Sequence, residues 1–369
     1  MQELSTMYEP RYIISHGMLK NIGRVDAARE VVRHAALVPA WEARFRESAL
    51  SRTIHHGTHL EGNELSLEQA LRLVKVKATT SSTAAQQAGI VARDRDVQEV
   101  INYRRVMDWM DNRINDEKRK NYTEKDFQDV HKVTMHRVLE DDKLGKYRNV
   151  DVVVRNSKTN EISFRPPPFI EVPFQTEAFF EWLNSDEGKE HHPVIRAGIT
   201  HYELVRIHPF VDGNGRAARA MSLMVLYMEG YDVKRFFSLE EYYDKNAASY
   251  YQALQSVGES AHFDLTYWLE YYSLGLAVDL DKVKHQVLKL SKDMGLKKKL
   301  GKQIALSDRQ IVILEAMQNN SGMIRSNELD KVLPDISVDT ILRDLKDLMN
   351  KGLVKKKGKT KGAYYQLKE

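Results

Sequence analysis

"RIHPFVDGNGRAARAM", residues 206–221, sets a histidine, an aspartate, an asparagine and arginines among one proline and two glycines. Helical patterns flank this stretch on both sides. Pro209 ends the first helix, while Gly213 and Gly215 let the backbone come close to a ligand. Unpaired amides and the dipole at the start of the second helix both favour an anion. The stretch therefore predicts a helix–loop–helix whose loop binds phosphate.

Side chains of the same loop supply further chemistry. His208, at the mouth of the loop, can accept a proton from an attacking hydroxyl. Asn214 and Arg216 add donors for phosphate oxygens, whereas Asp212 suits a Mg²⁺ that bridges to the phosphates. The glycines are not followed by Gly-Lys-Ser/Thr, so this is not a Walker A loop. The set suits transfer from a nucleotide to a protein hydroxyl; the plain alternative is a turn with a capping histidine and solvated arginines.

Length and composition bound the class of protein. At 369 residues the chain is long enough for two domains with a smaller appendage. A hydrophobic content of 42% and a charged content of 29% fit a globular protein, and a net charge of +4 is too mild to argue for nucleic acid. The absence of cysteine excludes disulfides and thiolate zinc sites. Without a signal-peptide pattern or an apolar run of roughly 18 residues, we expect a cytoplasmic protein that does not enter a membrane.

A helical period dominates residues 1–275, with one exception between Gly145 and Pro173. There "YRNVDVVVRNSKTNEISFRPPP" combines a β-branched run, a polar turn at Ser157–Asn160 and a short return strand that three prolines close. This pattern predicts a β-hairpin. We expect its first strand, Val152–Arg155, to offer an unpaired edge to an extended segment of another protein.

The last part of the chain changes character. Residues 281–303 are polar and basic and indicate a connecting helix. Helical segments follow at 307–320, where Ser307 and Gln310 form a capping box, at 325–333 and at 337–352. Two short strands around a basic turn complete a pattern that resembles a winged helix. The turn and its strands carry lysines that suit DNA phosphates or form a solvated hairpin: Lys355, Lys356, Lys357, Lys359 and Lys361.

"HPFVDGNGRAAR", residues 208–219, resembles the signature of the Fic family of protein adenylyltransferases, His-x-Phe-x-Asp/Glu-Gly-Asn-Gly-Arg-x-x-Arg, at every fixed position. The resemblance extends over residues 40–275. "GKYRNVDVVV" and "RPPPFIEVPF" are similar to the family's flap hairpin, and "YYDKNAASYYQAL" is similar to the helix that closes its adenine pocket. The resemblance implies a mainly helical fold with a β-hairpin flap. It also implies ATP as the substrate with Mg²⁺ or Mn²⁺, and transfer of AMP to a Ser, Thr or Tyr hydroxyl of a protein.

Matching positions give each residue its implied role. By resemblance His208 is the catalytic base and Asp212 the metal ligand. The implied ATP-binding residues are Val152, Val153, Val154 and Arg155 of the flap, Gly213, Asn214, Gly215, Arg216 and Arg219 of the motif, and Tyr251 of the adenine-pocket helix.

"HHGTHLEGNELSLEQ", residues 55–69, resembles the inhibitory helix of Fic proteins that regulate themselves, Ser/Thr-x-x-x-Glu-Gly/Asn. The resemblance implies that Glu61 pairs with Arg219 and displaces the γ-phosphate of ATP; alternatively, Glu61 is a helix-surface acid. Gly57 stands where the family has Ser or Thr, so we expect a looser inhibitory helix that Gly57→Ser would tighten. The neighbouring His55, His56 and His59 lack the glutamate of a zinc-protease motif and are interpreted as packing or capping residues.

Two functions of different classes remain. The first is an adenylyltransferase that Glu61 inhibits and that also removes AMP in some states. The second is a DNA-binding regulator with the Fic core as a nucleotide-sensing domain. Expected partners are ATP and a target protein, with DNA and a second copy of the chain as further candidates. The predicted regions are an N-terminal helical region with the inhibitory helix (1–100), the Fic core (101–278), a linker helix (279–303) and a winged helix (304–369).

Overall fold

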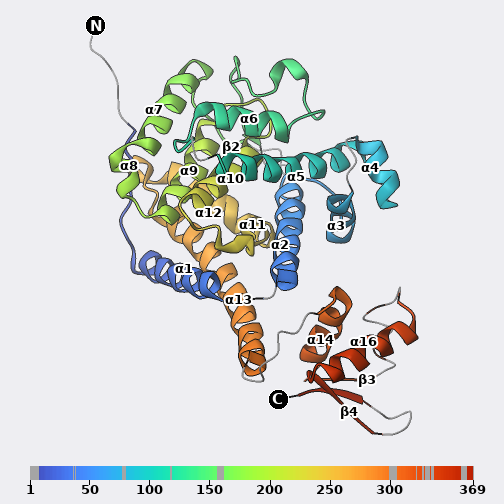
Figure 1. The fold of residues 1–369 in the computed structure, drawn as a ribbon. Coiled ribbons are helices and arrows are strands. Elements are labelled where there is room, and N and C mark those ends of the chain that lie inside the picture. Colours follow the sequence, from blue (N-terminus) through green and yellow to red (C-terminus); the bar gives the residue numbers. More distant parts are fainter. Residues whose placement is uncertain are drawn as a thin grey trace. The chain divides into compact units, whose positions relative to one another are not determined.

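The computed structural model describes residues 8–35, 37, 39–76, 80–116, 119–155, 162–298, 306–320, 322–325, 328, 333, 336–358 and 364–368. The chain divides into two compact units, Met1–His34 with Phe45–Gln286, and Ala35–Arg44 with Val287–Glu369. The described residues are mainly helical, which confirms the predicted fold class at that level (Figure 1). Among them, no helix combines the length and the apolar character needed to cross a bilayer.

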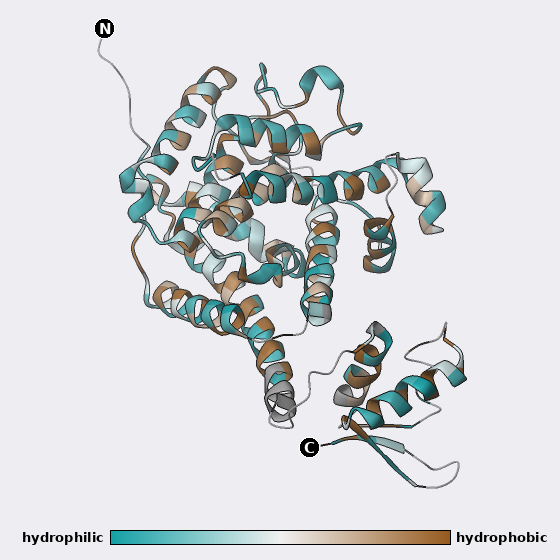
Figure 2. Cartoon of the chain, viewed as in Figure 1, coloured by the Kyte–Doolittle hydropathy of each residue, from teal (hydrophilic) through white to brown (hydrophobic). Residues whose placement is uncertain are grey.

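The first unit, which holds the glycine loop, is built from helices α1 to α13, except that the start of α2 and the end of α13 belong to the second unit. Their bounds are α1 His16–His34, α2 Pro39–His59, α3 Leu67–Lys75, α4 Ser81–Ala88, α5 Asp94–Ile114, α6 Glu124–Thr134, α7 Val172–Asn184, α8 Asp186–Glu190, α9 Pro193–Ile207, α10 Asn214–Met228, α11 Leu239–Lys245, α12 Ala247–Glu259 and α13 Thr266–Lys298. Figure 2 shows hydrophilic and hydrophobic residues alternating around most of these helices, as expected when one face of each helix is buried.

Helix α10 lies near the centre of this unit, in contact with α5, α6 and α9 (Figure 1). Most of its residues are small or apolar, and the helix is buried over most of its length; the buried apolar residues are Ala217, Ala218, Ala220, Met221, Leu223, Met224, Val225 and Leu226. A helix with so little polar surface is stable only when neighbouring elements surround it. The loop that precedes α10 is therefore held on a rigid support.

Local signals in the sequence set several helix ends. The predicted capping box at Ser307 is confirmed, because its side chain accepts from the Gln310 amide and the Gln310 side chain accepts from the Ser307 amide. A second capping box starts α3 at Ser66. Pro193 starts α9, where its missing amide hydrogen costs nothing, and Gly230 follows α10 with a φ of 75°.

The hairpin between α6 and α7 consists of β1 (Val154–Arg155) and β2 (Ile162–Phe164), paired antiparallel with Val154 opposite Phe164. The first strand is shorter than predicted, because Val152 and Val153 precede it without strand pairing. The predicted turn at Ser157–Asn160 lies outside the described residues. Val153 is 37% exposed, so it remains accessible beside the strand.

The second unit contains a small sheet and a separate core. Its elements are α14 Asp308–Asn319, α16 Val338–Asn350, β3 Met323–Arg325, β4 Val354–Lys357 and β5 Tyr364–Leu367, with the strands in the order β3-β5-β4. The core is formed by Ile313, Leu314, Met317, Ile324, Ile341, Leu345, Leu348, Leu353, Val354 and Tyr365. The strands β4 and β5 were predicted, whereas β3 was missed because three residues are too few to show an alternating pattern. Most of the helix predicted at 325–333 lies outside the described residues, as do Lys359 and Lys361, and Arg325 belongs to β3.

Candidate active site

The loop between α9 and α10 is closed by its own backbone and side chains. His208 follows α9 with a left-handed φ of 51°, and Gly213 precedes α10 with a φ of 78°. Asn214 accepts from the Phe210 amide and donates to the Phe210 carbonyl, both at 2.8 Å. The side chain of Asn214 therefore holds the loop rather than facing phosphate, which corrects the role that the sequence suggested for it.

His131 on α6 supports the loop from below. Its Nδ1 accepts from the Gly145 amide (3.0 Å), so its Nε2 carries the proton and donates to the Asp212 carbonyl (2.9 Å). Its ring stacks on Phe210 at a centroid distance of 3.8 Å. Burial lowers the pKa of His131 to about 4, so it stays neutral in this arrangement. This residue was missed in the sequence, where a histidine in an amphipathic helix gives no signal.

His208 has the geometry of a base. Its Nδ1 lies 3.2 Å from the Val205 carbonyl, which favours the tautomer with the proton on Nδ1. Nε2 then has its lone pair available, and it has no hydrogen bond among the described residues. Burial lowers the pKa of His208, although the Val205 carbonyl opposes the shift. The imidazole is therefore neutral near pH 7 and able to accept a proton.

Arg148 joins the His208 loop to the hairpin. Its side chain donates from Nε to the His208 carbonyl (2.9 Å), from Nη1 to the Val150 carbonyl (3.0 Å) and from Nη2 to the Pro167 carbonyl (2.5 Å). Val150 and Pro167 lie at the bases of the two hairpin strands, so one buried guanidinium fixes both relative to His208. No local sequence pattern indicates this contact, because nothing near Arg148 distinguishes it from a solvated arginine.

Glu61 and Arg219 form an ion pair across the loop. Arg219 Nη1 lies 2.9 Å from Glu61 Oε1, and Arg219 Nη2 donates to the Gly57 carbonyl at 2.9 Å. Burial raises the pKa of Glu61, but Arg219 and Arg216 outweigh it and hold the pKa below its usual value. A Cβ added at Gly215 would lie 2.4 Å from Glu61 Oε1. The Glu61 carboxylate therefore fills the space over the glycine loop where α10 begins.

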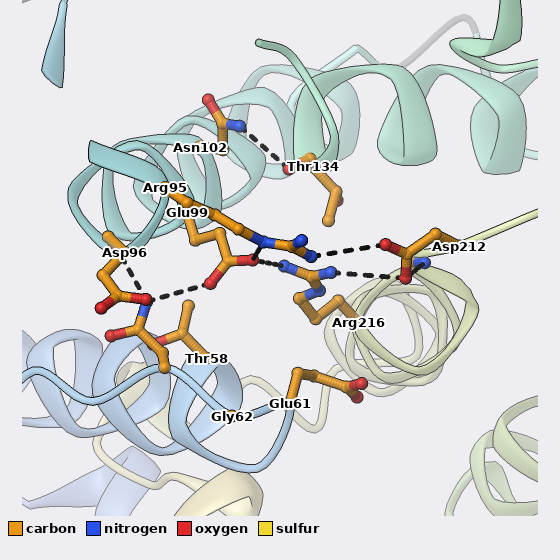
Figure 3. Close-up of polar contacts among 12 residues, drawn as sticks. Thr58, Glu61, Gly62, Arg95, Asp96, Glu99, Asn102, Thr134, Asp212 and Arg216 are labelled. Carbon is orange, nitrogen blue, oxygen red and sulfur yellow. Dashed lines mark hydrogen bonds and ion pairs between the residues drawn. The ribbon is translucent and has the colours of Figure 1, made fainter. Parts of the chain in front are cut away.

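A second ion-pair network, shown in Figure 3, surrounds Arg216. Arg216 Nη1 lies 2.9 Å from Glu99 Oε1, and both side chains are buried. Arg95, one turn before Glu99 on α5, lies 3.1 Å from the same oxygen and reaches Asp212 Oδ2 at 3.4 Å. Glu99 and Arg95 were missed in the sequence; their i, i+4 spacing was visible but indicates only a solvated helix pair.

Asp212, the metal ligand that the resemblance implies, has a side chain 47% exposed and an Oδ1 that accepts from the Gly213 amide at 2.6 Å. Among the described residues, no group of three or more His, Cys, Asp or Glu side chains is arranged to hold a metal ion. Mg²⁺ that arrives with nucleotide phosphates needs only one or two protein carboxylates, because phosphate oxygens and water complete its shell. An accessible carboxylate beside an anion-binding loop fits that requirement.

Tyr251 lies on α12, half exposed, and its hydroxyl donates to the Leu60 carbonyl at 3.3 Å. It therefore contacts the turn that carries Glu61, whereas the adjacent Tyr250 is buried against His201. Of the histidines of α2, His55 is buried and packs against the rings of His56 and His59, as predicted, whereas the other two have a polar partner. His56 and His59 each place Nδ1 2.7 Å from one oxygen of Asp244 on α11, which ties α2 to α11.

Tyr103 explains the glycine at position 57. A Cβ added at Gly57 would lie 2.7 Å from Tyr103 Cε1, and the Tyr103 hydroxyl donates to Glu240 Oε1 at 3.2 Å. The tyrosine ring thus occupies the space that a larger residue at 57 would need. The expectation that serine at this position would tighten the helix is wrong on steric grounds.

We now expect Gly57→Ser to destabilise the protein by about 1–3 kcal/mol, because a buried position with no free space has to shift to take extra atoms. Thermal unfolding monitored by circular dichroism measures the effect. Gly258→Ser on α12 is the matched control, since a Cβ there meets nothing within 4 Å. An unfolding temperature unchanged by Gly57→Ser would contradict the close contact with Tyr103.

The site thus combines two helices, α9 and α10, a glycine loop between them that arginines surround, and a β-hairpin beside the loop. This combination characterises a helical domain that binds phosphate at the start of a buried helix. Residues 121–226 match the model of the Fic/DOC family, so this segment is a Fic domain, as the signature at residues 208–219 predicted.

Relatives and solved structures agree with that assignment. The chain is 26% identical over 219 residues to a protein adenylyltransferase Fic of Culex quinquefasciatus and 27% identical over 202 residues to one of Nematostella vectensis. These matches cover 59% and 54% of this chain but only 40% and 43% of those proteins. A Fic family protein from Desulfovibrio desulfuricans is similar over 98% of both chains, with a TM-score of 0.63 and 22% identity. Fic-1 from C. elegans is similar over 74% of this chain and 73% of that chain, with a TM-score of 0.58 and 21% identity. The structural likeness shows a shared fold.

Proposed function

We propose that this chain transfers AMP from ATP to a serine, threonine or tyrosine hydroxyl of a protein. The observation that carries the proposal is a neutral His208, with Nε2 available, at the mouth of a glycine loop that starts a buried helix. The curated relatives are protein adenylyltransferases by name, which supports the same reaction.

In the proposed reaction the target hydroxyl oxygen attacks the α-phosphorus of ATP and passes its proton to His208 Nε2. The bond from the α-phosphorus to the bridging oxygen breaks, and pyrophosphate leaves. Arg216 and Arg219 each bury an Nε that has no hydrogen-bond partner within the described part of the chain. Such donors suit phosphate oxygens, together with the amides of Gly213–Gly215 at the start of α10. Asp212 would hold Mg²⁺ or Mn²⁺, which neutralises phosphate charge when bound.

Glu61 is proposed to inhibit this transfer. Its carboxylate pairs with the Arg219 guanidinium and fills the space over Gly215, so it competes directly with the γ-phosphate for the same donors. Tyr251 is proposed to contribute to nucleotide binding from the neighbouring helix, and Val152–Arg155 to cover the bound nucleotide. Removal of AMP by water in the Glu61-engaged state is a further part of the proposal.

The hairpin is proposed to receive the target protein by strand addition. Val153→Pro should lower target labelling about tenfold or more and ATP affinity by a clearly smaller factor, because proline removes a donor and stiffens an edge that an extended segment pairs with. Labelling of a target and ATP binding by calorimetry are measured on the same folded variant. Equal labelling by the variant and the parent would exclude docking at this edge; Val150→Ala, at the hairpin base, serves as a mild control.

The second unit is proposed to be a winged-helix module that recruits the target or regulates the core. The proposed regions are an N-terminal helical region (1–100), the Fic core (101–278), a linker helix (279–303) and the winged helix (304–369). The alternative, a DNA-binding regulator, is less favoured, because α16 carries the acids Asp339, Asp344 and Asp347. Asp344 is also committed to Arg309 of α14 at 2.7 Å.

The position of the label in ATP tests the proposed reaction. The Glu61→Gly variant is incubated with a cell lysate and with ATP labelled at either the α- or the γ-phosphate. AMP transfer predicts protein labelling from the α-phosphate only, because pyrophosphate takes the γ-phosphate away. Labelling from the γ-phosphate would indicate a kinase instead. ATP binding is measured directly under the same conditions, so that labelling from neither phosphate by a variant that binds ATP would refute the transfer.

A further inference from the structure

Asn63 ties the turn after α2 to α5. Its buried side chain donates from Nδ2 to the Asp96 carbonyl and to Glu99 Oε2, both at 3.0 Å, and its Oδ1 accepts from the Leu65 amide at 3.1 Å. Reversing the amide would set oxygen against two oxygens, so these contacts fix its orientation. Since Glu61 lies two residues earlier in the same turn, whatever holds Asn63 also holds Glu61 in place.

Glu99 connects that turn to the glycine loop. One oxygen accepts from Asn63, while the other lies 2.9 Å from Arg216 Nη1 and 3.1 Å from Arg95 Nε. Figure 3 shows Glu99 between Arg95 and Arg216, on the face of α5 that looks toward Glu61. An ionised carboxylate accepts hydrogen bonds at both oxygens, whereas an amide accepts at one end only. The two cations orient Glu99 so that its remaining oxygen faces Asn63.

We propose that Asn63 and Glu99 form a latch that positions the inhibitory turn and so keeps Glu61 on Arg219. This proposal rests on the proposed function and deepens its regulation. Glu61 alone has a side chain 26% exposed, at the end of a turn that contains Gly62 with a φ of 91°. Among the described residues, the buried side-chain attachment of this turn to α5 is Asn63, which donates to the Asp96 carbonyl and to Glu99. The other contact from this side is an exposed one, from Arg93 Nη2 to the Gly62 carbonyl at 3.3 Å.

The substitution Asn63→Asp breaks the latch with almost no change in shape. It keeps the oxygen that accepts from Leu65 but turns the donor to Glu99 and Asp96 into an acceptor that repels both. We expect AMP transfer to rise about tenfold, as for loss of one buried hydrogen bond to a charged group. In the Glu61→Gly background the same substitution should change transfer by less than about twofold, because the carboxylate that the latch positions is gone.

Amide hydrogen exchange measures the latch without reference to activity. The amides of Leu60, Glu61, Gly62, Asn63 and Leu65 are all hydrogen-bonded within this segment. Asn63→Asp should speed their exchange about tenfold or more. Adding Glu99→Gln should recover part of the protection, since an amide at position 99 can donate to a carboxylate at position 63. Asn115→Asp, exposed at the end of α5, is the control with the same change in charge and should alter nothing.

The outcomes separate the latch from the proposed function. Unchanged exchange over residues 60–65 in Asn63→Asp would overturn the latch, as would an equal loss of transfer in both backgrounds, which marks a merely structural role. A double variant that exchanges as fast as Asn63→Asp would remove Glu99 from the latch. If no variant transfers AMP, Glu61→Gly included, the proposed function fails while the exchange data still decide the latch.

Discussion

Replacing His208 by alanine is expected to lower AMP transfer by about 10²- to 10⁴-fold, because a positioned general base contributes a factor of that size. ATP binding should persist, since the phosphates face the glycine loop and the arginines rather than this imidazole. The rate is measured with labelled ATP in the Glu61→Gly background, where transfer is not inhibited, and ATP affinity is measured by calorimetry.

The backbone at position 208 calls for a second variant. His208 has a left-handed φ of 51°, and its carbonyl accepts from Arg148, so alanine there introduces strain as well as removing the base. Asparagine tolerates this conformation better than alanine. His208→Asn should therefore lose as much AMP transfer as His208→Ala but unfold at a higher temperature than His208→Ala. His34→Ala, on the exposed end of α1, is the control. Transfer at the parent rate by either His208 variant would show that another group accepts the proton.

Glu61→Gly should raise AMP transfer by about ten- to a hundredfold. A hydrogen-bonded charge pair such as that between Glu61 and Arg219 contributes about 1.5–3 kcal/mol. Its loss makes the Arg219 guanidinium and the space over Gly215 available to the γ-phosphate. Self-labelling and target labelling under identical ATP and Mg²⁺ measure the effect. Glu61→Gln keeps the size of the side chain and removes its charge, so it should fall between the parent and the glycine variant.

Glu64→Gln supplies the matched control for that change. Glu64 lies in the same segment with a side chain 75% exposed and contacts Arg93 only at 3.5 Å, so neutralising it should leave transfer unchanged. If the Glu61→Gly variant is no more active than the parent, Glu61 does not inhibit transfer and is an acid on the helix surface without a regulatory role. A similar activation by Glu64→Gln would show that the net charge of the turn matters rather than the contact with Arg219.

The loop and its helices could be predicted from the sequence because their determinants are local. Pro209, Gly213 and Gly215 restrict or free the backbone where they stand, and the apolar run of α10 needs burial wherever it lies. The hairpin was predicted for the same reason, from a β-branched run and a row of prolines within a short segment. The base, the implied metal ligand and the phosphate-binding residues of the motif lie within residues 208–219. The resemblance to the Fic signature could therefore be recognised without knowledge of the fold.

The support of this site depends on contacts between residues that lie far apart in the sequence. The contact between Arg148 and His208 spans 60 positions, and that between Arg95 and Asp212 spans 117. A helical period shows which face of a helix is buried, but not which helix covers it or which polar group it meets there. For that reason the sequence predicted a looser helix at Gly57, whereas Tyr103 of α5 fills that space. Asn63 and Glu99 are coupled only because α2 ends beside α5, a meeting that depends on the packing of the whole core.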